Sequence, residues 1–349
     1  MKNLEYININ DSLNEVETAL ARKGVLQEEQ KNMIGGYLHP DSATLKYYHA
    51  SRTLFYYFLN TERYPEVLPY AKKMALDCFS DAEHYMQEDH PESDFPEVCI
   101  FFPYDPDIFD QKVISHWQTM MKTVLDDWVK EGCPNKWYSH TREHLEDFLL
   151  QEAPFHLTDG AWLRGSNPVG TIDSVDAALI SVYFDELGNG DVAMNHCNVY
   201  NENLKSIGIH MPQVYKRSFI EQRNLLDGSF VSPTFALAVS LFPRTFKPEI
   251  IGMTLWLELS SAALHAPQAK ILEKYSLSSL FSKLHTAVDN PTCGHSYLAK
   301  EAVKDYLSEI LKVEGKASMT EHWKRIWRGY TAYAITGGFK HEFEAKWNA

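Results

Sequence analysis

A carboxylate that continues a helical apolar stripe is the feature that most restricts how this chain can fold. The segment TIDSVDAALISVYFDEL repeats apolar residues at the spacing of one helix face, namely at Ile172, Val175, Leu179 and Val182. The next position on that face is Glu186. A lone carboxylate in an apolar interior is costly, so it must be paired, protonated or bound to a cation. This segment therefore predicts a helix that carries an acid into the protein interior.

Two other segments show the same pattern. Glu258 interrupts an apolar face of PEIIGMTLWLELSSAALH, and Glu152 and Asp159 share an apolar face in HLEDFLLQEAPFHLTDGAWL. One such acid can be satisfied in a core by Arg, Tyr or Trp. Three helices that all direct acids inward favour a cation held between them.

The whole chain shows helical periodicity, and the alternation typical of strands is scarce. We therefore expect an all-α fold. The Pro- and Asp-rich stretch of residues 88–107 predicts a boundary between an N-terminal helical region, 1–107, which packs on or extends the core, and a helical bundle, 108–349. Bundle helices after residue 138 are expected at roughly 139–164, 171–187, 197–206, 233–242, 247–265, 267–288, 295–313 and 319–335.

Composition restricts the partners and the compartment. The formal net charge is −14, whereas nucleic acids and anionic membranes require a cationic face, so neither is expected as a partner. The five cysteines are scattered and form no CxxC pair, which favours reduced thiols over a disulfide framework. No secretory leader and no apolar run long enough to span a membrane is present. We therefore expect a soluble cytoplasmic protein.

The segment HTAVDNPTCGH carries the densest group of potential metal ligands. His285 and Asp289 are four residues apart and therefore neighbours on one helical face. Such a pair alone is typical of a surface hydrogen bond. His295 follows Asp289 by six residues, and Pro291 and Gly294 predict a break in the helix that allows His295 to return beside the pair.

The segment DELGNGDVAMNH supplies a second histidine close to an inward acid. Gly188 and Gly190 permit a sharp turn after the helix that ends at Glu186, so that His196 can reach the same interior point. Imidazole and carboxylate ligands without a thiolate favour iron or manganese over structural zinc, and six of them suggest two metal ions. The predicted metal ligands are Glu186, His196, Glu258, His285, Asp289 and His295.

These residues resemble the haem-oxygenase-like diiron oxidases and oxygenases, iron-dependent enzymes that share the helical fold of haem oxygenase without its haem. The family pattern is a Glu followed by a His on one core helix, a Glu on a second, and a His-xxx-Asp with a further His on a third. The matching positions, in that order, are Glu186 with His196, then Glu258, then His285, Asp289 and His295. The match covers roughly residues 140–315. His295 departs from the pattern, because the last histidine usually follows the aspartate by three residues.

The resemblance implies a haem-oxygenase-like bundle that holds two Fe(II) ions and uses O2 as a co-substrate. It implies an O2-dependent oxidoreductase that oxidises a small metabolite, an amino acid or an amino-acid-like compound, in specialised metabolism. Desaturation, C–C cleavage and N-oxygenation are the reactions it suggests. An external electron donor and a homodimer are possible partners.

The resemblance also points to residues outside the six. Some N-oxygenating members carry an extra carboxylate ligand, for which Asp159 is the first candidate here and Glu152 the second. Arg164 follows Asp159 closely and is expected either to clamp a substrate carboxylate or to form a surface salt bridge.

Two alternatives remain open at the level of sequence. The first is a non-catalytic helical protein on the same scaffold, such as an iron carrier or an accessory subunit with a vestigial site. The second is a relative that handles haem, or one that hydrolyses its substrate through a nucleophilic cysteine. Cys197 and Cys293 neighbour the predicted ligands and are the candidates for such a nucleophile.

Overall fold

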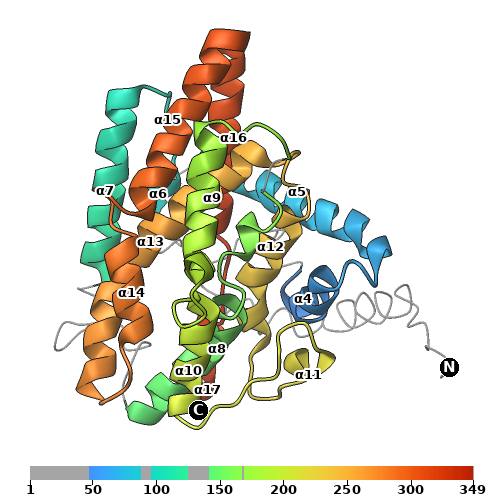
Figure 1. Ribbon diagram of the computed structural model, residues 1–349, viewed down its shortest axis with the longest axis vertical. Coiled ribbons are helices and arrows are strands. Elements are labelled where there is room, and N and C mark those ends of the chain that lie inside the picture. Colours follow the sequence, from blue (N-terminus) through green and yellow to red (C-terminus); the bar gives the residue numbers. More distant parts are fainter. Residues whose placement is uncertain (1–46, 88–95, 125–140, 167–168, 349) are drawn as a thin grey trace.

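All regular structure in the described residues is helical, which confirms the all-α prediction (Figure 1). The computed structural model describes residues 47–87, 96–124, 141–166 and 169–348. The earlier helices are α4 (Ser51–Leu59), α5 (Leu68–Tyr85), α6 (Pro96–Cys99) and α7 (Pro106–Val124). The later helices are α8 (Arg142–His156), α9 (Ser174–Glu186), α10 (His196–Ser206), α11 (Arg217–Ile220), α12 (Val231–Ser240), α13 (Lys247–Lys274), α14 (Leu280–Val288), α15 (His295–Glu314), α16 (Lys316–Ala334) and α17 (Lys340–Asn348).

Helix α13 is the central element of the bundle. It packs against α7, α14, α15 and α16, and most of its residues are buried. A helix that is apolar on all sides belongs in a core, and α13 is surrounded in this way. Helix α9 lies along α15, and α10 packs on α8 and α14. The space enclosed by α9, α10, α13, α14 and α15 holds the polar side chains described below.

The N-terminal helices share a core with the bundle. Helix α4 packs on α12, α5 packs on α12 and α16, and α7 packs on α13. Residues 1–46 lie outside the described residues, and the predicted boundary at residue 107 stays a prediction.

The helix boundaries differ from the prediction around Pro267. Separate helices were expected over 247–265 and 267–288, whereas α13 continues through Pro267 to Lys274 and α14 begins at Leu280. Proline removes one main-chain hydrogen bond and normally ends or kinks a helix. The turns on both sides of this proline are buried, so tertiary packing holds the helix together across it.

The predicted helix over 139–164 also stops early. Helix α8 ends at His156, and the chain turns at Gly160 into a short 3-10 helix. Gly160 has a φ of +76°, in the left-handed region that favours glycine. A Cβ at this position would lie 2.8 Å from the Cβ of Glu186, so the turn packs directly on the end of α9. This turn carries Asp159.

The structure differs from the prediction at one residue of the apolar face of α9. Ile172 precedes the helix and is 55% exposed. Helix α9 begins at Ser174, because the Asp173 side chain caps it by accepting a hydrogen bond from the Asp176 N–H. The rest of the predicted stripe is buried, namely Val175, Leu179, Val182 and Glu186.

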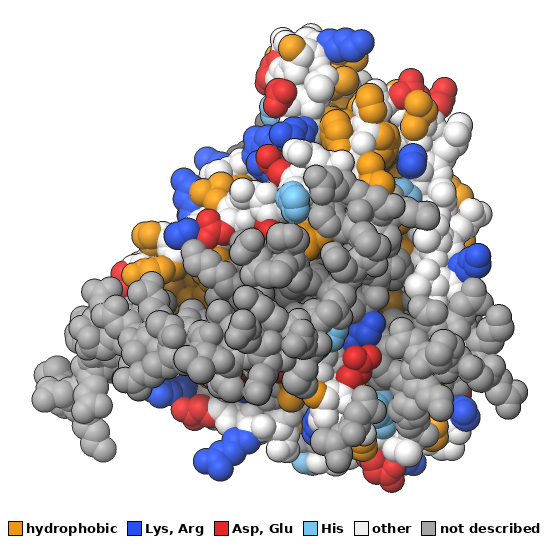
Figure 2. Space-filling view, turned by 180° about the vertical axis from the view of Figure 1, so that it is seen from behind, with side chains coloured by type: hydrophobic (Ala, Val, Ile, Leu, Met, Phe, Trp, Pro, Cys, Tyr) orange, Lys and Arg blue, Asp and Glu red, His pale blue; other side chains and the backbone are white. Residues whose placement is uncertain are grey.

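Figure 2 shows Lys, Arg, Asp and Glu side chains of both charge signs close to one another on the described part of the face in view. Exposed apolar side chains include Ile108 and Ile114 on α7, and Leu311 and Val313 near the end of α15. Within the described ranges, no helix combines the length and the apolar character that a membrane span requires.

Helices α13 and α16 approach each other closely at two glycines. A Cβ on Gly252 of α13 would overlap the carbonyl oxygen of Ile326, and a Cβ on Gly329 of α16 would overlap that of Glu249. The obstacle is backbone in both cases, so no side-chain rotation relieves it. These two glycines therefore set the spacing of the central helix pair.

Replacing Gly252 by alanine is expected to lower the free energy of unfolding by about 1–3 kcal/mol, because α13 and α16 must move apart. Gly338→Ala is the control, since a Cβ there meets no atom within 4 Å. Chemical denaturation of both variants measures the effect. Equal stabilities of the two variants would contradict the close approach.

Candidate metal centre

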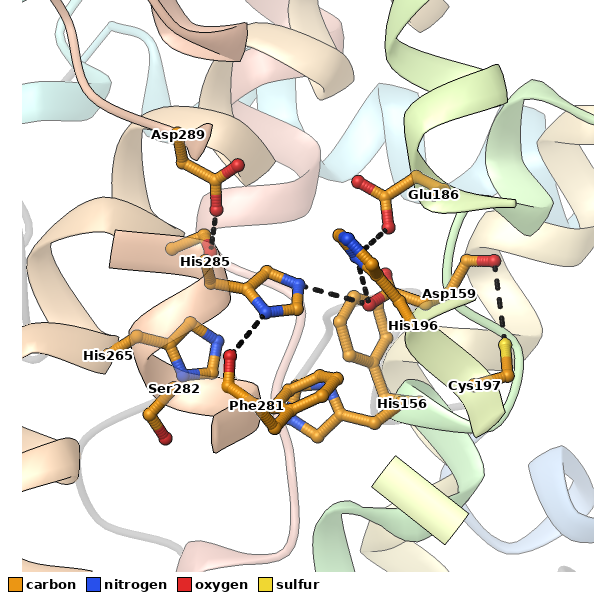
Figure 3. A network of polar contacts seen from close by, with 12 residues as sticks. His156, Asp159, Glu186, His196, Cys197, His265, Phe281, Ser282, His285 and Asp289 are labelled. Carbon is orange, nitrogen blue, oxygen red and sulfur yellow. Dashed lines mark hydrogen bonds and ion pairs between the residues drawn. The ribbon is translucent and has the colours of Figure 1, made fainter. Parts of the chain in front are cut away.

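All six predicted ligand residues lie in one buried cluster, and each has a relative exposure of 5% or less. Asp159 joins them at 8%. Figure 3 shows five of these side chains, drawn from α9, α10, α14 and the turn after α8, pointing toward one another. Most stand at helix ends: Glu186 is the last residue of α9, His196 the first of α10, Asp289 the C-cap of α14, and His295 the first of α15.

The turn between α9 and α10 brings His196 back to Glu186. Gly188 and Gly190 have φ values of +75° and +88°, as the predicted sharp turn requires. A Cβ on Gly188 would lie 2.5 Å from the backbone nitrogen of Asn195, whose side chain caps α10. As a result, His196 Nδ1 lies 2.6 Å from Glu186 Oε2.

The break between α14 and α15 brings His295 to the cluster in a similar way. Gly294 fits tightly against the carbonyl oxygen of Val288, where a side chain would overlap it. Helix α15 then begins at His295, whose Nδ1 lies 3.2 Å from Asp289 Oδ1 and 3.2 Å from Glu258 Oε2. His295 therefore lies beside Asp289 even though it follows six residues later in the sequence.

The ligand-type atoms form two groups that share one residue. In each group the nitrogen and oxygen atoms lie within 4.8 Å of one another. The first group is Asp159, Glu186, His196 and His285, and the second is Glu186, Glu258 and His295. Asp289 adjoins the second group through His295.

Several of these buried atoms form no hydrogen bond of acceptable geometry with any described residue, although buried polar atoms almost always form one. They are Glu186 Oε2, His196 Nδ1, Glu258 Oε1, Asp289 Oδ1 and His295 Nδ1. Their close polar neighbours are other ligand-type atoms of the same cluster, such as Glu186 Oε2 at 2.6 Å from His196 Nδ1 and Asp289 Oδ1 at 3.2 Å from His295 Nδ1. This is the arrangement expected of side chains that bind a metal ion.

Glu249, also on α13, shows how this protein satisfies a purely structural acid. Its fully buried carboxylate forms ion pairs with Arg325 and Arg328. Among the described residues, the cluster acids have no Arg or Lys as an ion-pair partner, only histidines. An ordinary core ion pair therefore does not account for the cluster.

A cavity of about 300 Å³ opens onto the cluster. Asp159, Glu186, Glu258, His285 and Asp289 form part of its wall, and Trp162 and Trp256 form apolar parts. This volume is at the lower end of the range for small-molecule sites.

A sequence profile for iron-containing redox enzymes matches residues 146–331, which is more than half of the chain. The chain belongs to the iron-containing redox enzyme family. None of the curated proteins matches it. The matched region runs from α8 into α16 and includes all seven cluster residues. Membership makes the protein an iron-containing oxidoreductase whose helical bundle is of the haem-oxygenase-like type, as the sequence predicted.

In this redox enzyme, neighbouring groups orient two of the cluster histidines. His285 Nδ1 donates a hydrogen bond to the Phe281 carbonyl at 3.0 Å, so Nε2 faces Asp159 at 3.3 Å (Figure 3). His295 Nε2 lies 2.8 Å from Asp185 Oδ2, which leaves Nδ1 for the cluster. Each ring therefore turns one nitrogen toward the shared space.

Sequence reasoning missed Asp185 and Ser261. Asp185 lies off the apolar stripe of α9, yet its carboxylate reaches His295 in the first turn of α15. The Ser261 hydroxyl donates to Asp289 Oδ2 at 2.5 Å. The one available signal was position, since each stands next to or one turn from a predicted ligand.

The structure does not bring Arg164 to the cavity of this enzyme. Its Nε donates to Ser240 Oγ at 3.0 Å and its Nη2 donates to the Phe58 carbonyl at 2.9 Å. Arg164 is also absent from the cavity wall. The guanidinium therefore links the ends of α4 and α12, and neither the predicted substrate clamp nor a surface salt bridge describes it.

The cysteine alternative also finds no support in the structure. Cys197 Sγ lies 3.9 Å from the Asp159 carbonyl oxygen, and burial raises the pKa of this thiol to about 12. Cys293 is exposed, and neither cysteine is part of the cavity wall. A nucleophilic thiolate needs a lowered pKa and access to the substrate.

Burial and close contacts shift the pKa values of the cluster acids. Burial raises the pKa of Glu258 and the nearby Asp289 raises it further, to about 8. Burial and the charge of Asp159 raise the pKa of Glu186. Burial would also raise the pKa of Asp159, but its contacts with His196 and His285 outweigh this and lower it.

The cluster histidines shift in the direction of the charged form. Burial lowers their pKa values, but the adjacent carboxylates more than offset this. The pKa is raised to about 11 for His196, to about 9 for His285 and to about 12 for His295. In the metal-free protein these shifts favour protonated histidines, whose positive charges offset those of the acids.

Metal binding to the metal-free enzyme is expected to release about three protons per chain at neutral pH, because each cluster histidine must lose one to bind. Protonated Glu258 adds to this number. Since protons compete with the metal, affinity should rise with pH and fall as pH drops. Calorimetry in buffers of different ionisation enthalpy counts the protons. A release below one proton would contradict the histidine assignment.

Proposed function

We propose that this enzyme is a non-haem diiron oxidase or oxygenase, which activates O2 to oxidise a small metabolite in specialised metabolism. The observation that supports this most directly is the sharing of Glu186 by two groups of buried ligand-type side chains. The two oxygens of a carboxylate can bind one cation each, so Glu186 would help to hold both ions. Helical bundles hold paired iron ions with carboxylates and histidines in this manner.

The ligand set divides between two positions. Asp159, His196 and His285 would hold one ion together with Glu186, and Glu258, Asp289 and His295 would hold the other. Oxygen and imidazole ligands without thiolate suit iron. When bound, Fe(II) would supply the electrons for the reduction of O2.

Charge also favours two ions over one. The four carboxylates of Asp159, Glu186, Glu258 and Asp289 are buried. With neutral histidines, two divalent cations balance these four negative charges, whereas one cation leaves an excess of two. Uncompensated charge in an apolar interior is strongly unfavourable.

The protein's own groups orient the ligands and shape the site. The Phe281 carbonyl and the Asp185 carboxylate hold the rings of His285 and His295, and the Ser261 hydroxyl holds Asp289. Trp162 and Trp256 line the cavity and limit the access of water to the reacting groups.

The substrate class and the reaction are parts of this proposal. An amino acid or amino-acid-like compound fits the cavity volume, and desaturation, C–C cleavage and N-oxygenation are the candidate reactions. An external electron donor and a homodimer belong to the same proposal. The alternative, a non-catalytic iron-binding or accessory protein, is distinguished by experiment.

Anaerobic loading with Fe(II) should give about two iron ions per chain. Exposure to O2 should then consume O2 and produce a transient visible absorption whose decay depends on the substrate present. Iron binding without O2 consumption, with every candidate substrate and reductant, would favour the non-catalytic alternative. A maximum of one iron ion per chain would rule out the diiron centre.

Single alanine substitutions should separate the two metal positions. Because Glu186 belongs to both groups, Glu186→Ala is expected to lose both ions, whereas His285→Ala and His295→Ala each retain about one. Iron content of purified protein, with circular dichroism as a check of folding, measures this. Glu202→Ala on the exposed side of α10 is the control. If His285→Ala kept two ions per chain, the ligand assignment would be wrong.

A further inference from the structure

The cavity holds a second polar group beside the metal cluster, which we call the distal quartet: Glu152, His156, His265 and Gln268. All four line the cavity. Gln268 Nε2 donates to Glu152 Oε2 at 3.0 Å, and His265 Nδ1 lies 2.7 Å from Gln268 Oε1. His156 closes the group, because its Nε2 lies 3.8 Å from Glu152 Oε1 and its ring centroid lies 5.7 Å from that of His265.

The quartet offers acceptors to a ligand. Gln268 Oε1 accepts a hydrogen bond from the Ser282 hydroxyl at 2.8 Å. An amide oxygen has no proton to donate, so Gln268 Oε1 is also the acceptor in its contact with His265 Nδ1. His265 Nδ1 therefore carries a proton, and its Nε2 presents a lone pair. Glu152 Oε1 accepts no hydrogen bond from any described residue, and the His156 ring at 3.8 Å is beyond hydrogen-bond distance.

Charge distinguishes the quartet from the rest of the cavity. No Lys or Arg from the described part of the chain lines the cavity. In the proposed function, two divalent ions balance the four cluster carboxylates, and Glu152 is the remaining acid. Its side chain is only 20% exposed, so a ligand that brings a positive charge gains more there than in water.

The quartet lies next to the metal cluster. The ring centroids of His265 and His156 are 4.6 Å and 6.4 Å from that of His285. Figure 3 shows both rings on the side of His285 that faces away from Asp289. A short ligand held at Glu152 therefore extends toward the cluster within one cavity.

We infer that the distal quartet binds a protonated amine of the substrate and that Glu152 selects it. An alkylammonium group brings one positive charge and three N–H donors, which match Glu152 Oε1 and the free imidazole lone pair of His265. This inference rests on the proposed function, which supplies the ions that balance the cluster. It assigns recognition to the amino end of an amino-acid-like substrate, in place of the carboxylate clamp predicted at Arg164.

The test measures binding, so that turnover is not needed. Protein loaded with Mn(II), with its metal content determined first, is titrated by calorimetry with pentylammonium, 1-pentanol and pentanoate. These probes share chain length and differ in charge. We expect pentylammonium to bind at least about tenfold more tightly than 1-pentanol, and pentanoate to bind most weakly.

Glu152→Gln keeps the shape of the side chain and removes its charge. It should weaken pentylammonium binding by roughly 10- to 100-fold and change 1-pentanol binding by less than about twofold. Glu152→Asp, which keeps the charge, should retain the preference for the cation. Glu146→Gln is the matched control, because Glu146 lies on the same helix, outside the cavity, in an ion pair with Arg142.

Equal affinity of wild type and Glu152→Gln for pentylammonium would overturn the inference. That result would follow if the amine bound the metal directly or if His156 already neutralised Glu152. A wild-type protein that prefers 1-pentanol or pentanoate would overturn it without any variant. The metal content separates the two proposals: two ions per chain without amine selection contradicts only the quartet. One ion per chain with amine selection through Glu152 contradicts only the diiron centre.

Discussion

The constraint on which the structure depends is the burial of four carboxylates that have no arginine or lysine partner among the described residues. Desolvation alone makes such a group unstable in an apolar core. The chain solves this problem in the usual way at Glu249, where two arginines form ion pairs with the acid. At Asp159, Glu186, Glu258 and Asp289 it places histidines instead, which can give up a proton to a metal ion. The rest of the bundle holds these groups together against their mutual repulsion.

The cluster is built mainly where helices begin and end. A side chain at a helix terminus can be directed by the turn that follows, and glycine permits turns that other residues cannot adopt. Gly188 returns His196 to Glu186, and Gly294 allows α15 to start at His295. Glu258 and His285 are the exceptions, since Glu258 stands in the middle of α13 and His285 lies inside α14. Short, tightly packed turns between helices thus position several of the ligand-type side chains.

Sequence patterns predicted the parts of this arrangement that depend on local spacing. Periodicity identified Glu186 and Glu258 as inward acids, and helix-breaking residues indicated the return of His295. The pattern could not reveal contacts between elements. The helix predicted over 139–164 ran through the turn that places Asp159 beside Glu186, where Gly160 has a positive φ and packs against the end of α9.

Other misassignments have the same origin in long-range packing. Asp185 is off the apolar stripe of its own helix, but the approach of α15 gives it a histidine partner. Arg164 is close in sequence to Asp159, yet its side chain turns to Ser240 and the Phe58 carbonyl. Helix α13 passes through Pro267 because burial on both sides outweighs the lost hydrogen bond.

The close approach of α13 and α16 at Gly252 and Gly329 has a consequence for how relatives with the same bundle can diverge. Trp256 and Tyr333 each stand one turn beyond these glycines, and both line the cavity. The distance between the two helices therefore affects how far apart these two parts of the cavity wall lie. A family member could admit a bulkier metabolite by enlarging either glycine, without altering any residue that touches the metabolite or the metal. The size of the accepted substrate would then change through substitutions at positions that lie outside the active site.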